Sequence, residues 1–518
     1  MRVKYSWVLA LLLAGCQLTQ PNNSEDNASS ETNNPPTAKQ TEPTPLPEAK
    51  LTPVETPQSQ EDVWQRIAMQ LDMPVPDHKS VDYYRKWYLK HPHHLKTVSK
   101  RAEPFLYLIT EQIEQRGLPL ELALLPVVES SFDAFAYSHG SAAGLWQFIP
   151  STGKMFGLEQ NFWYDGRRDV YRATDAALTY LTRLNKRFDG EWTHAIAAYN
   201  SGGGRVSRAI RKNKKLGKPI DFFSLDLPKE TSGYVPKLLA LADIIANQKK
   251  YGIEIPAIAN KPVVSVVDPK EQLDLAIAAK YAGISVKELQ SLNPAYNQWS
   301  TAPNGPHQLL LPSHTVSQFS TLVEKNRGKG LKLVRYKVKS GDSLSVLAKR
   351  NNTTTKVIQR ANGLKGHNIR AGQYLLIPVS ARDEKAYELS AANRLAKTQS
   401  RSRGKYKLTH IVSSGESLWS IAKANKISHQ SLAKWNGMGP RDTLRKGQKL
   451  VIWKNSSDGA IIRTVFYNVR SGDTISGIAN KFKVKSRDVV KWNNLNKSKY
   501  LKPGQKLKLY VDVTKVSV

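Results

Sequence analysis

One glutamate, Glu129, has the surroundings of a general acid. It follows an apolar stretch and precedes a serine, within the run LALLPVVESSFDAFAYSHGSAAGLWQFIP at 122–150. If that stretch packs, the carboxylate is poorly hydrated, and poor hydration raises its pKa. A carboxylic acid that stays protonated near neutral pH can donate a proton to a leaving group. The alternative is a solvated glutamate at a helix end, because most charged residues are exposed.

Four short motifs around this glutamate occur in a fixed order. They are ES at 129–130, GLWQFIP at 144–150, AYNSG at 198–202 and ETSGYV at 230–235. Together they resemble the motifs of the lytic transglycosylases, a family of lysozyme-like peptidoglycan enzymes, over roughly residues 100 to 250. The resemblance implies a mostly α, lysozyme-like catalytic domain, which we expect over residues 62–255.

The same resemblance implies a reaction and a set of roles. The expected reaction breaks the β-1,4 bond between N-acetylmuramic acid and N-acetylglucosamine and leaves a 1,6-anhydro end. One glutamate acts first as acid and then as base, and the acetamido group of the substrate assists. The motif positions assign catalysis to Glu129, contact with the acetamido group to Ser138, cleft lining to Gln147 and Ile149, and positioning of Glu129 by hydrogen bonds to Tyr199 and Tyr234.

Other interpretations of these residues stay open. Most glycosidases use two carboxylates, so Asp133 or Asp165 across the cleft from Glu129 would permit a hydrolytic muramidase reaction. Ser138 and Gln147 can serve only to shape the chain, and both tyrosines can be core residues with satisfied hydroxyls. Trp146 is either a sugar platform or, as we favour, core.

Hydrophobic periodicity places the elements that would hold this site. From Asp62 onward apolar residues recur at helical spacing. Pro119 is well placed at the start of the helix that leads to Glu129. Further helices are expected over Thr174–Phe188, Trp192–Tyr199 and Leu238–Ile245.

The C-terminal part contains an internal repeat, with copies at 335–379, 406–453 and 465–511. Each copy has an SG(D/E) turn, an asparagine 21 residues after the glycine, and then a Gly-Gln pair before an apolar strand. The asparagines are Asn362, Asn436 and Asn493. The pattern predicts a small βααβ unit and resembles the LysM module, which binds glycans that contain N-acetylglucosamine. Residues 260–312 resemble a degenerate copy without the entry turn. The polar linkers at 380–405 and 455–462 are expected to be flexible.

Charge is concentrated in this repeat region. Residues 331–518 carry a net charge of +29 out of +34 for the chain of 518 residues. Such a charge favours a polyanionic partner, and peptidoglycan, anionic lipid and nucleic acid all qualify. No recognisable nucleic-acid motif accompanies it. A wall-binding protein without activity is a further alternative, against which the retained Glu129 argues.

The N-terminus has the features of a secreted lipoprotein. Residues 1–16 combine a charged start, an apolar stretch too short to span a bilayer permanently, and the sequence LAGC. This sequence resembles a lipobox, which implies acylation of Cys16, and Gln17 in place of aspartate points to the outer membrane, facing the periplasm. Residues 17–60 have the composition of a disordered tether. An ordinary cleaved signal is the alternative.

No cofactor or metal is expected. Cys16 is the single cysteine, so there is neither an intrachain disulfide nor a cysteine-based zinc site. The histidines show no metal-ligand spacing, and the cluster at 91–94 is expected to lie in a solvated loop.

Overall fold

The computed structural model describes residues 55–138, 140–455, 462–495 and 501–512. The expected signal, Cys16 and almost all of the tether lie outside these residues. Among the described residues no helix is both long enough and apolar enough to cross a membrane.

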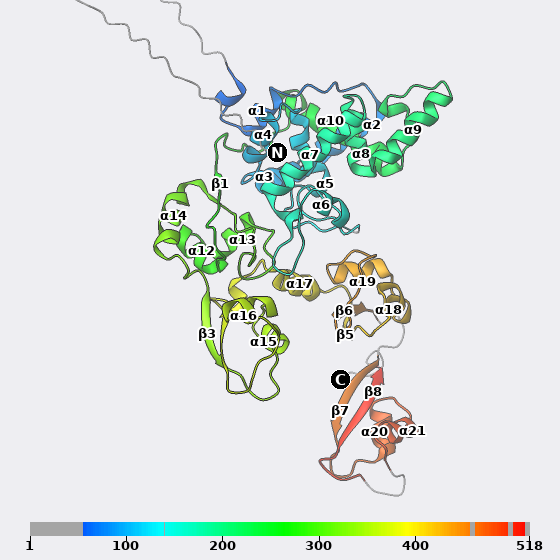
Figure 1. Cartoon of the computed structure of the whole chain (residues 1–518). Helices are drawn as coiled ribbons and strands as arrows, with labels where there is room; N and C mark the ends of the chain where they lie inside the picture. The colour runs from blue at the N-terminus through cyan, green and yellow to red at the C-terminus, as the bar shows by residue number, and fades with distance from the viewer. Residues whose placement is uncertain (1–54, 139, 456–461, 496–500, 513–518) are drawn as a thin grey trace, which may run out of the picture. The chain divides into compact units, whose positions relative to one another are not determined.

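The first domain is helical, as expected. Its main elements are α1 Val63–Ala68, α2 Lys79–Lys90, α3 Pro92–Ala102, α4 Leu106–Glu114, α5 Leu125–Ser130, α6 Pro150–Met155, α7 Val170–Arg187, α8 Trp192–Ser201, α9 Gly203–Lys215, α10 Lys229–Ala246 and α11 Gln248–Tyr251 (Figure 1). Short 3-10 turns occur at η1 Pro57–Ser59, η2 Leu120–Leu124, η3 Gly166–Arg168 and η4 Phe222–Ser224. The three expected helices are α7, α8 and α10, although α7 and α10 begin earlier than predicted.

Helix α10 runs through the centre of this domain. It contacts α2, α8, α1 and α5, and most of its side chains are buried in the main core. Pro236 lies inside α10, seven residues after its first residue, so the helix lacks the hydrogen bond that an N–H at this position would donate to the carbonyl of Ser232. Because most of α10 is buried, Tyr234 is held on a rigid element.

Residues 264–325 form a second, smaller unit. Strands β1 Val264–Val267 and β2 Leu309–Pro312 pair antiparallel, with α12 Leu275–Ala282 and α13 Val286–Leu292 between them and α14 Val316–Lys325 after them. Asn293 donates its side-chain amide to Leu310 O and accepts from Leu310 N, both at 2.8 Å. This bond pair fastens the end of α13 to β2.

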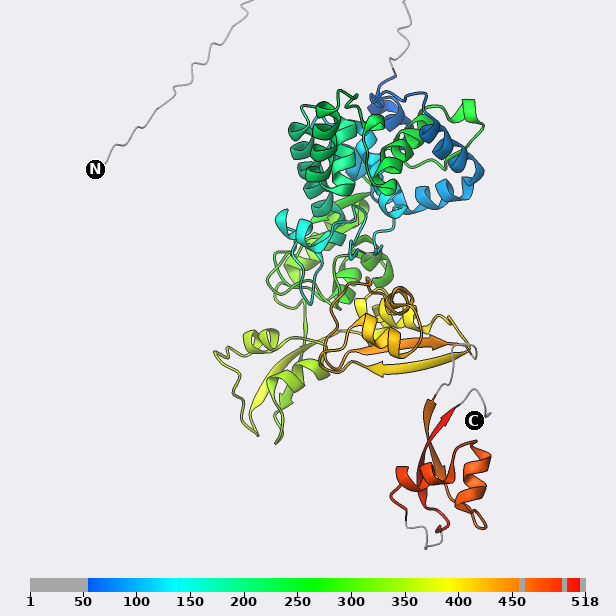
Figure 2. The ribbon, with the colours of Figure 1, turned by 90° about the vertical axis from the view of Figure 1, so that its right-hand side faces the viewer.

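The three repeat copies each form a two-stranded antiparallel sheet covered by two helices. Figure 2 shows β5 and β6 as one such strand pair. The elements are β3 Lys332–Lys337, α15 Leu344–Arg350, α16 Thr355–Ala361 and β4 Tyr374–Val379; β5 Tyr406–Ile411, α18 Leu418–Ala424, α19 His429–Trp435 and β6 Lys449–Lys454; β7 Ile462–Asn468, α20 Ile475–Lys481, α21 Ser486–Trp492 and β8 Lys506–Asp512. The predicted βααβ order is confirmed in every copy.

The repeated asparagine clamps a helix to the closing strand. Asn362, Asn436 and Asn493 each donate to and accept from one residue of that strand, with distances of 2.6–2.8 Å. The bond pair in the 264–325 unit is the same, so this unit shares the clamp although it lacks the entry turn.

The prediction of a flexible linker over 380–405 is wrong. Residues 384–386 form the 3-10 turn η6, and helix α17 covers Ala391–Ser400. Tyr387 is 2% exposed and its hydroxyl donates to Asp274 at 2.8 Å. Because one buried tyrosine with a carboxylate partner can order a polar segment, composition alone was misleading here. The linker at 455–462 lies largely outside the described residues.

Candidate active site

Glu129 lies near the end of a short helix whose first three residues, 125–127, are buried. Helix α5 follows the 3-10 turn η2 directly, and all residues of η2 are buried. The helix stops because Ser131 and then Phe132 adopt left-handed backbone conformations, with φ of 51° and 57°. Consecutive non-glycine residues in this region are strained, and the strain fixes how the helix end presents its carboxylate.

The pKa of Glu129 is raised to about 7, chiefly by burial. The side chain is half-buried, and it lines a cleft of about 730 Å³. A hydrogen bond from Tyr234 and the ammonium group of Lys237 lower the pKa, while the nearby carboxylate of Glu230 raises it. The desolvation predicted from the apolar run is therefore confirmed.

The two tyrosines of the motifs play different parts. The Tyr234 hydroxyl donates to Glu129 Oε1 at 2.6 Å, as predicted. The expected bond from Tyr199 to Glu129 is wrong, because the Tyr199 hydroxyl donates instead to Trp146 O at 2.8 Å. Tyr199 still lines the cleft, and its ring lies 5.5 Å from that of Tyr180. It supports the cleft wall at Trp146.

The other predicted residues lie on the same cleft. Ser138, Gln147 and Ile149 all line it together with Glu129 and Tyr199. Ile149 is 44% exposed, which is unusual for a large apolar side chain and leaves it open to a bound molecule. The structure thus brings together residues from α5, the following turns and α8.

Residues 137–138 and 140–148 form a compact turn, here called the wall turn, along one side of the cleft. Isolated β-bridges join Tyr137 to Ala143 and Ala143 to Phe148. Ser138 Oγ accepts hydrogen bonds from Gly140 N at 3.2 Å and Ala142 N at 3.1 Å. Because both bonds use oxygen lone pairs, the hydroxyl proton is left for another acceptor.

Gln147 has a fixed orientation in the wall turn. Its backbone is left-handed, with φ of 50°, and its Nε2 donates to Gly144 O at 2.8 Å. Its Oε1 is therefore available as an acceptor on the cleft. Trp146 beside it is 0% exposed and donates to Thr174 Oγ1 at 2.9 Å, which confirms the core interpretation over a sugar platform.

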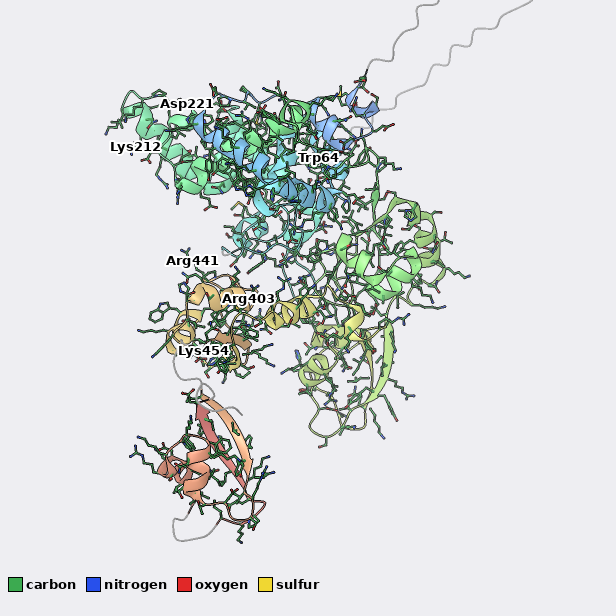
Figure 3. The ribbon with its side chains drawn as sticks, turned by 180° about the vertical axis from the view of Figure 1, so that it is seen from behind. Trp64, Lys212, Asp221, Arg403, Arg441 and Lys454 are labelled. Carbon is green, nitrogen blue, oxygen red and sulfur yellow. The ribbon has the colours of Figure 1, made fainter. Side chains whose placement is uncertain are left out.

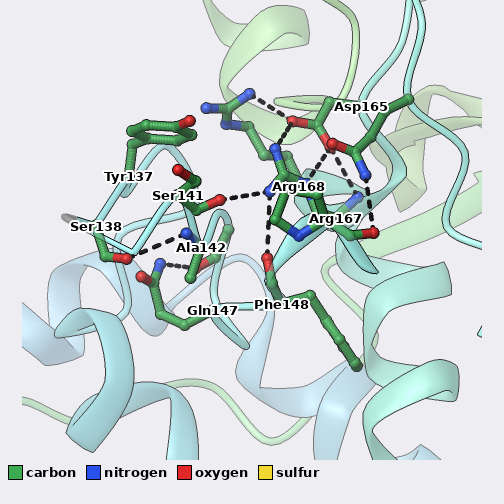
Figure 4. A network of polar contacts seen from close by, with 12 residues as sticks. Tyr137, Ser138, Ser141, Ala142, Gln147, Phe148, Asp165, Arg167 and Arg168 are labelled. Carbon is green, nitrogen blue, oxygen red and sulfur yellow. Dashed lines mark hydrogen bonds and ion pairs between the residues drawn. The ribbon is translucent and has the colours of Figure 1, made fainter. Parts of the chain in front are cut away.

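A buried arginine holds the wall turn from behind. Figure 4 shows Arg167 between Asp165 and the turn. Its Nε and Nη2 bind the two carboxylate oxygens of Asp165 at 2.9 and 2.8 Å, and its Nη1 donates to Ser141 O at 2.6 Å and to Phe148 O at 3.3 Å. Both ends of the segment that contains Gln147 are thus tied to one guanidinium.

Neither aspartate considered as a second carboxylate lines the cleft. Asp165 is 6% exposed, bridges Arg167 and Arg168, and has its pKa lowered by these partners against the effect of burial. Asp133 accepts from the backbone of Phe135 at 2.9 Å. The second carboxylate that the cleft does contain belongs to Glu230.

Sequence reasoning missed three residues of the site. Glu230 opens the ETSGYV motif, so the signal was present but was assigned only to the motif tyrosine. Arg167 lies in an unremarkable polar stretch, and only its buried contacts reveal its part. Lys237 lies one turn after Tyr234 and donates to Val128 O at 3.4 Å. In the part of the chain that the structure describes, no group of three or more potential ligands is arranged to hold a metal ion.

Comparison with known families agrees with this arrangement. The model of the family described as "Transglycosylase SLT domain" matches residues 107–222. "Lytic transglycosylase MltD, LysM-like domain" matches residues 263–327, and "LysM domain" matches 336–378, 410–453 and 467–509. The fold, the cleft and these matches define a lytic transglycosylase that carries LysM modules.

Comparison with individual proteins shows which lytic transglycosylases this chain resembles. The membrane-bound lytic murein transglycosylase D of Escherichia coli K12 is 39% identical over 412 residues, which cover 77% of this chain and 86% of the relative. The chain therefore belongs to the family of membrane-bound lytic murein transglycosylase D. An N-acetylmuramoyl-L-alanine amidase of Staphylococcus aureus is 32% identical over 38% of this chain and 55% of its own length. Among solved structures, the 70 kDa soluble lytic transglycosylase of Escherichia coli is 20% identical, with a TM-score of 0.25, over 34% of this chain and 32% of its own.

Proposed function

We propose that the protein cleaves the β-1,4 bond between N-acetylmuramic acid and N-acetylglucosamine in peptidoglycan and leaves 1,6-anhydro ends, with Glu129 as the catalytic residue. The observation that carries the proposal is a carboxyl group with a pKa near 7 on the wall of an open cleft. A group with this pKa is substantially populated both as an acid and as a base at neutral pH. One residue can then serve both steps.

The two steps balance around Glu129. In the first, protonated Glu129 donates its proton to the bridging O4 as the C1–O4 bond breaks, which leaves a carboxylate and positive charge at C1. In the second, the carboxylate removes the proton of the 6-hydroxyl as O6 bonds to C1. Glu129 ends protonated, no water is consumed, and the net change is one bond exchanged for another.

The polar residues of the wall turn suit recognition of the sugar. Ser138 has a free hydroxyl proton, which we assign to the carbonyl oxygen of the acetamido group that assists at C1. Gln147 offers Oε1 as an acceptor for an amide or hydroxyl proton. Ile149 would pack on the apolar face of a sugar ring. Tyr199 would keep the wall in place, and Tyr234 would orient Glu129.

The LysM modules would hold the enzyme on its polymer. Each is a small unit with its own apolar core. Several weak sites on one chain raise the effective concentration of substrate at the cleft without a new contact there. Their basic charge suits a polymer that carries carboxylates.

We further propose a lipid anchor at Cys16 in the outer membrane, facing the periplasm. The support is the LAGC sequence and the membrane-bound relative. Replacement of Cys16 by alanine should then move the protein from the membrane fraction to the soluble periplasmic fraction. Retention of that variant in the membrane would exclude the anchor and leave the catalytic proposal untouched.

Mass spectrometry of the products tests the reaction itself. Wild-type protein incubated with purified peptidoglycan should release anhydro-muropeptides, and Glu129→Gln should release none while it still binds the polymer. Hydrated reducing ends would instead indicate a muramidase. Glu230→Gln is the matched variant for that outcome, because Glu230 is the other carboxylate on the cleft. Its products should stay anhydro if Glu129 acts alone.

A further inference from the structure

Helix α9 presents a surface made of positive charge alone. Its buried face consists of Gly203, Val206, Ala209 and Asn213. Apart from a glycine, every exposed residue on it is an arginine or lysine, and these form what we call the basic ridge: Arg205, Arg208, Arg211, Lys212, Lys214 and Lys215. With 13 residues the helix is about 20 Å long.

The ridge is little neutralised by its own domain. Within the described residues, the ion pair that this helix makes is Lys212 with Asp226, at 3.0 Å, and both side chains are more than half exposed. Such pairs contribute little and are screened by salt. Figure 3 shows Lys212 at the periphery of the helical domain, whereas Trp64 lies in its interior. Like charges along one helix repel one another and destabilise it. Binding to an anionic partner explains their presence more simply than a role in the fold.

The ridge begins at the active-site cleft. Helix α9 starts immediately after Gly202, which lines the cleft beside Asn200 and Ser201. Gly203 packs against the guanidinium of Arg187, which donates to Ser207 Oγ at 3.3 Å.

Helix α7 extends the same charge toward the cleft wall. Arg183 lies over the ring of Phe156 at 5.0 Å, and that ring lies 5.0 Å from Tyr180 of the cleft. Positive charge therefore continues from the cleft wall along α7 to α9.

We infer that the basic ridge binds the carboxylates of the stem peptides that the glycan strand carries next to the sugars in the cleft. This inference rests on the proposed function. A strand held across the cleft places its peptides beside it, and each peptide brings carboxylate groups of the opposite charge. The long, flexible side chains of arginine and lysine on one exposed helix face can pair with carboxylates in several positions. The ridge thereby makes the enzyme favour peptide-bearing strands over bare glycan.

An anionic lipid surface is the competing partner, since Leu216 just beyond the helix is 56% exposed. The position of the ridge beside the cleft favours the peptides, because a ligand there is part of the substrate. Lipid binding would instead be independent of what occupies the cleft.

Two double variants of the full-length chain test the inference. R208Q/K215Q removes two charges from the ridge, and K96Q/K100Q removes two exposed charges from α3, whose residues do not line the cleft. Each is assayed on peptidoglycan strands with intact stem peptides and on strands from which an amidase has removed the peptides. Vesicles that contain phosphatidylglycerol provide the lipid probe.

On intact strands R208Q/K215Q should raise KM about 3- to 10-fold with kcat unchanged. The difference in KM between this variant and wild type should disappear in high salt. On peptide-free strands it should match wild type, and K96Q/K100Q should match wild type on both substrates. Equal KM values for all proteins on intact strands would overturn the inference, and a defect confined to vesicle binding would assign the ridge to lipid. If no protein produced anhydro ends on intact strands, the proposed function would fail instead.

Discussion

Tyr234 and Glu129 are joined by a 2.6 Å hydrogen bond, although 105 residues separate them in the chain. Helix α10 supplies the donor and α5 the acceptor, and the two helices are in contact. The hydroxyl donates to the carboxylate, so it stabilises the ionised form of Glu129 and offsets part of the pKa rise that burial causes. In the proposed reaction, the tyrosine thereby stabilises the carboxylate that forms when Glu129 donates its proton.

Tyr234→Phe should accordingly raise the pKa of Glu129 above its value near 7. The alkaline limb of the pH profile of kcat, where the protonated form of Glu129 is lost, should move to higher pH. At pH 7 kcat should fall about 10-fold, because the carboxylate formed in the first step loses a hydrogen bond, and a hydrogen bond to a charged group contributes about 1.5–3 kcal/mol. Tyr83→Phe, at a site 64% exposed, is the control and should change neither. A lower kcat with an unmoved pH profile would show that Tyr234 acts only on packing.

The raised pKa of Glu129 also predicts how stability depends on pH. The folded-state pKa is about 7 against an ordinary value of 4.5, so the ionised carboxylate destabilises the folded state. Wild type should equal Glu129→Gln below pH 4.5, lose stability relative to it as pH rises toward 7, and stay lower above that.

The expected difference at pH 8 is about 1–3 kcal/mol. Calorimetry of the unfolding transition of the helical domain at pH 4 and pH 8 measures it. A difference in Tm that is the same at both pH values would mean that the substitution acts through packing, and that burial does not raise the pKa.

Arg167 should govern substrate binding without touching substrate. In Arg167→Lys the single ammonium can reach Asp165 or the wall turn but cannot form the fork that binds both. We expect kcat/KM to fall about 10- to 100-fold, mainly through KM, because a small misplacement of the wall is costly. Arg116→Lys, at an exposed pair with Asp175, should leave the kinetics unchanged. If Arg167→Lys lowered Tm but left kcat and KM unchanged, the role of Arg167 would be structural only.

Two glycines have similar φ angles but different surroundings, so replacing each by alanine distinguishes backbone strain from steric overlap. Gly144 and Gly157 have φ of 80° and 77°. A Cβ at Gly144 would lie 2.0 Å from Arg167 O, whereas one at Gly157 would meet nothing within 4 Å. Gly157→Ala should lower the free energy of unfolding by about 1 kcal/mol, from backbone strain alone. Gly144→Ala should lower it clearly more and abolish activity, since the wall turn must move. Thermal unfolding and product release measure both, and equal effects would contradict the close approach.

The sequence predicted the parts of the site that lie in motifs and missed those that depend on distant contacts. The apolar run before Glu129 contained enough information to predict that its pKa is raised, because local burial is the main cause. The wrong partner of Tyr199 has a different origin. Motif order places its hydroxyl near the cleft, but which acceptor it reaches depends on the path of the chain at Trp146, which no local pattern encodes.

The same distinction applies to the fold. Regular spacing predicted α7, α8, part of α10 and the βααβ order, since these follow from periodicity and turn residues. It missed α9, and the histidine cluster at 91–94, expected in a solvated loop, instead opens helix α3. The ordered linker was missed because it is held by contacts with remote residues, among them Tyr387 with Asp274 across 113 residues and Leu389 N with Gln290 across 99 residues. Arg167 was missed for the same reason. Buried polar pairs between remote segments are the features that composition and spacing do not reveal.

The asparagine clamp should decide whether a LysM module folds. Asn436 is 3% exposed, and its loss would leave the N–H and C=O of Val451 without partners inside the module. Each unsatisfied group costs about 1–3 kcal/mol, and a module of this size has little stability to spare. In Asn436→Ala we expect the second module to unfold, seen as fast amide hydrogen exchange over residues 406–453, with weaker binding to peptidoglycan. Asn425→Ala in the same module removes only a bond to Ile421 O at the end of its own helix, so exchange there should stay slow. Slow exchange in both variants would show that packing of the apolar core alone holds the module together.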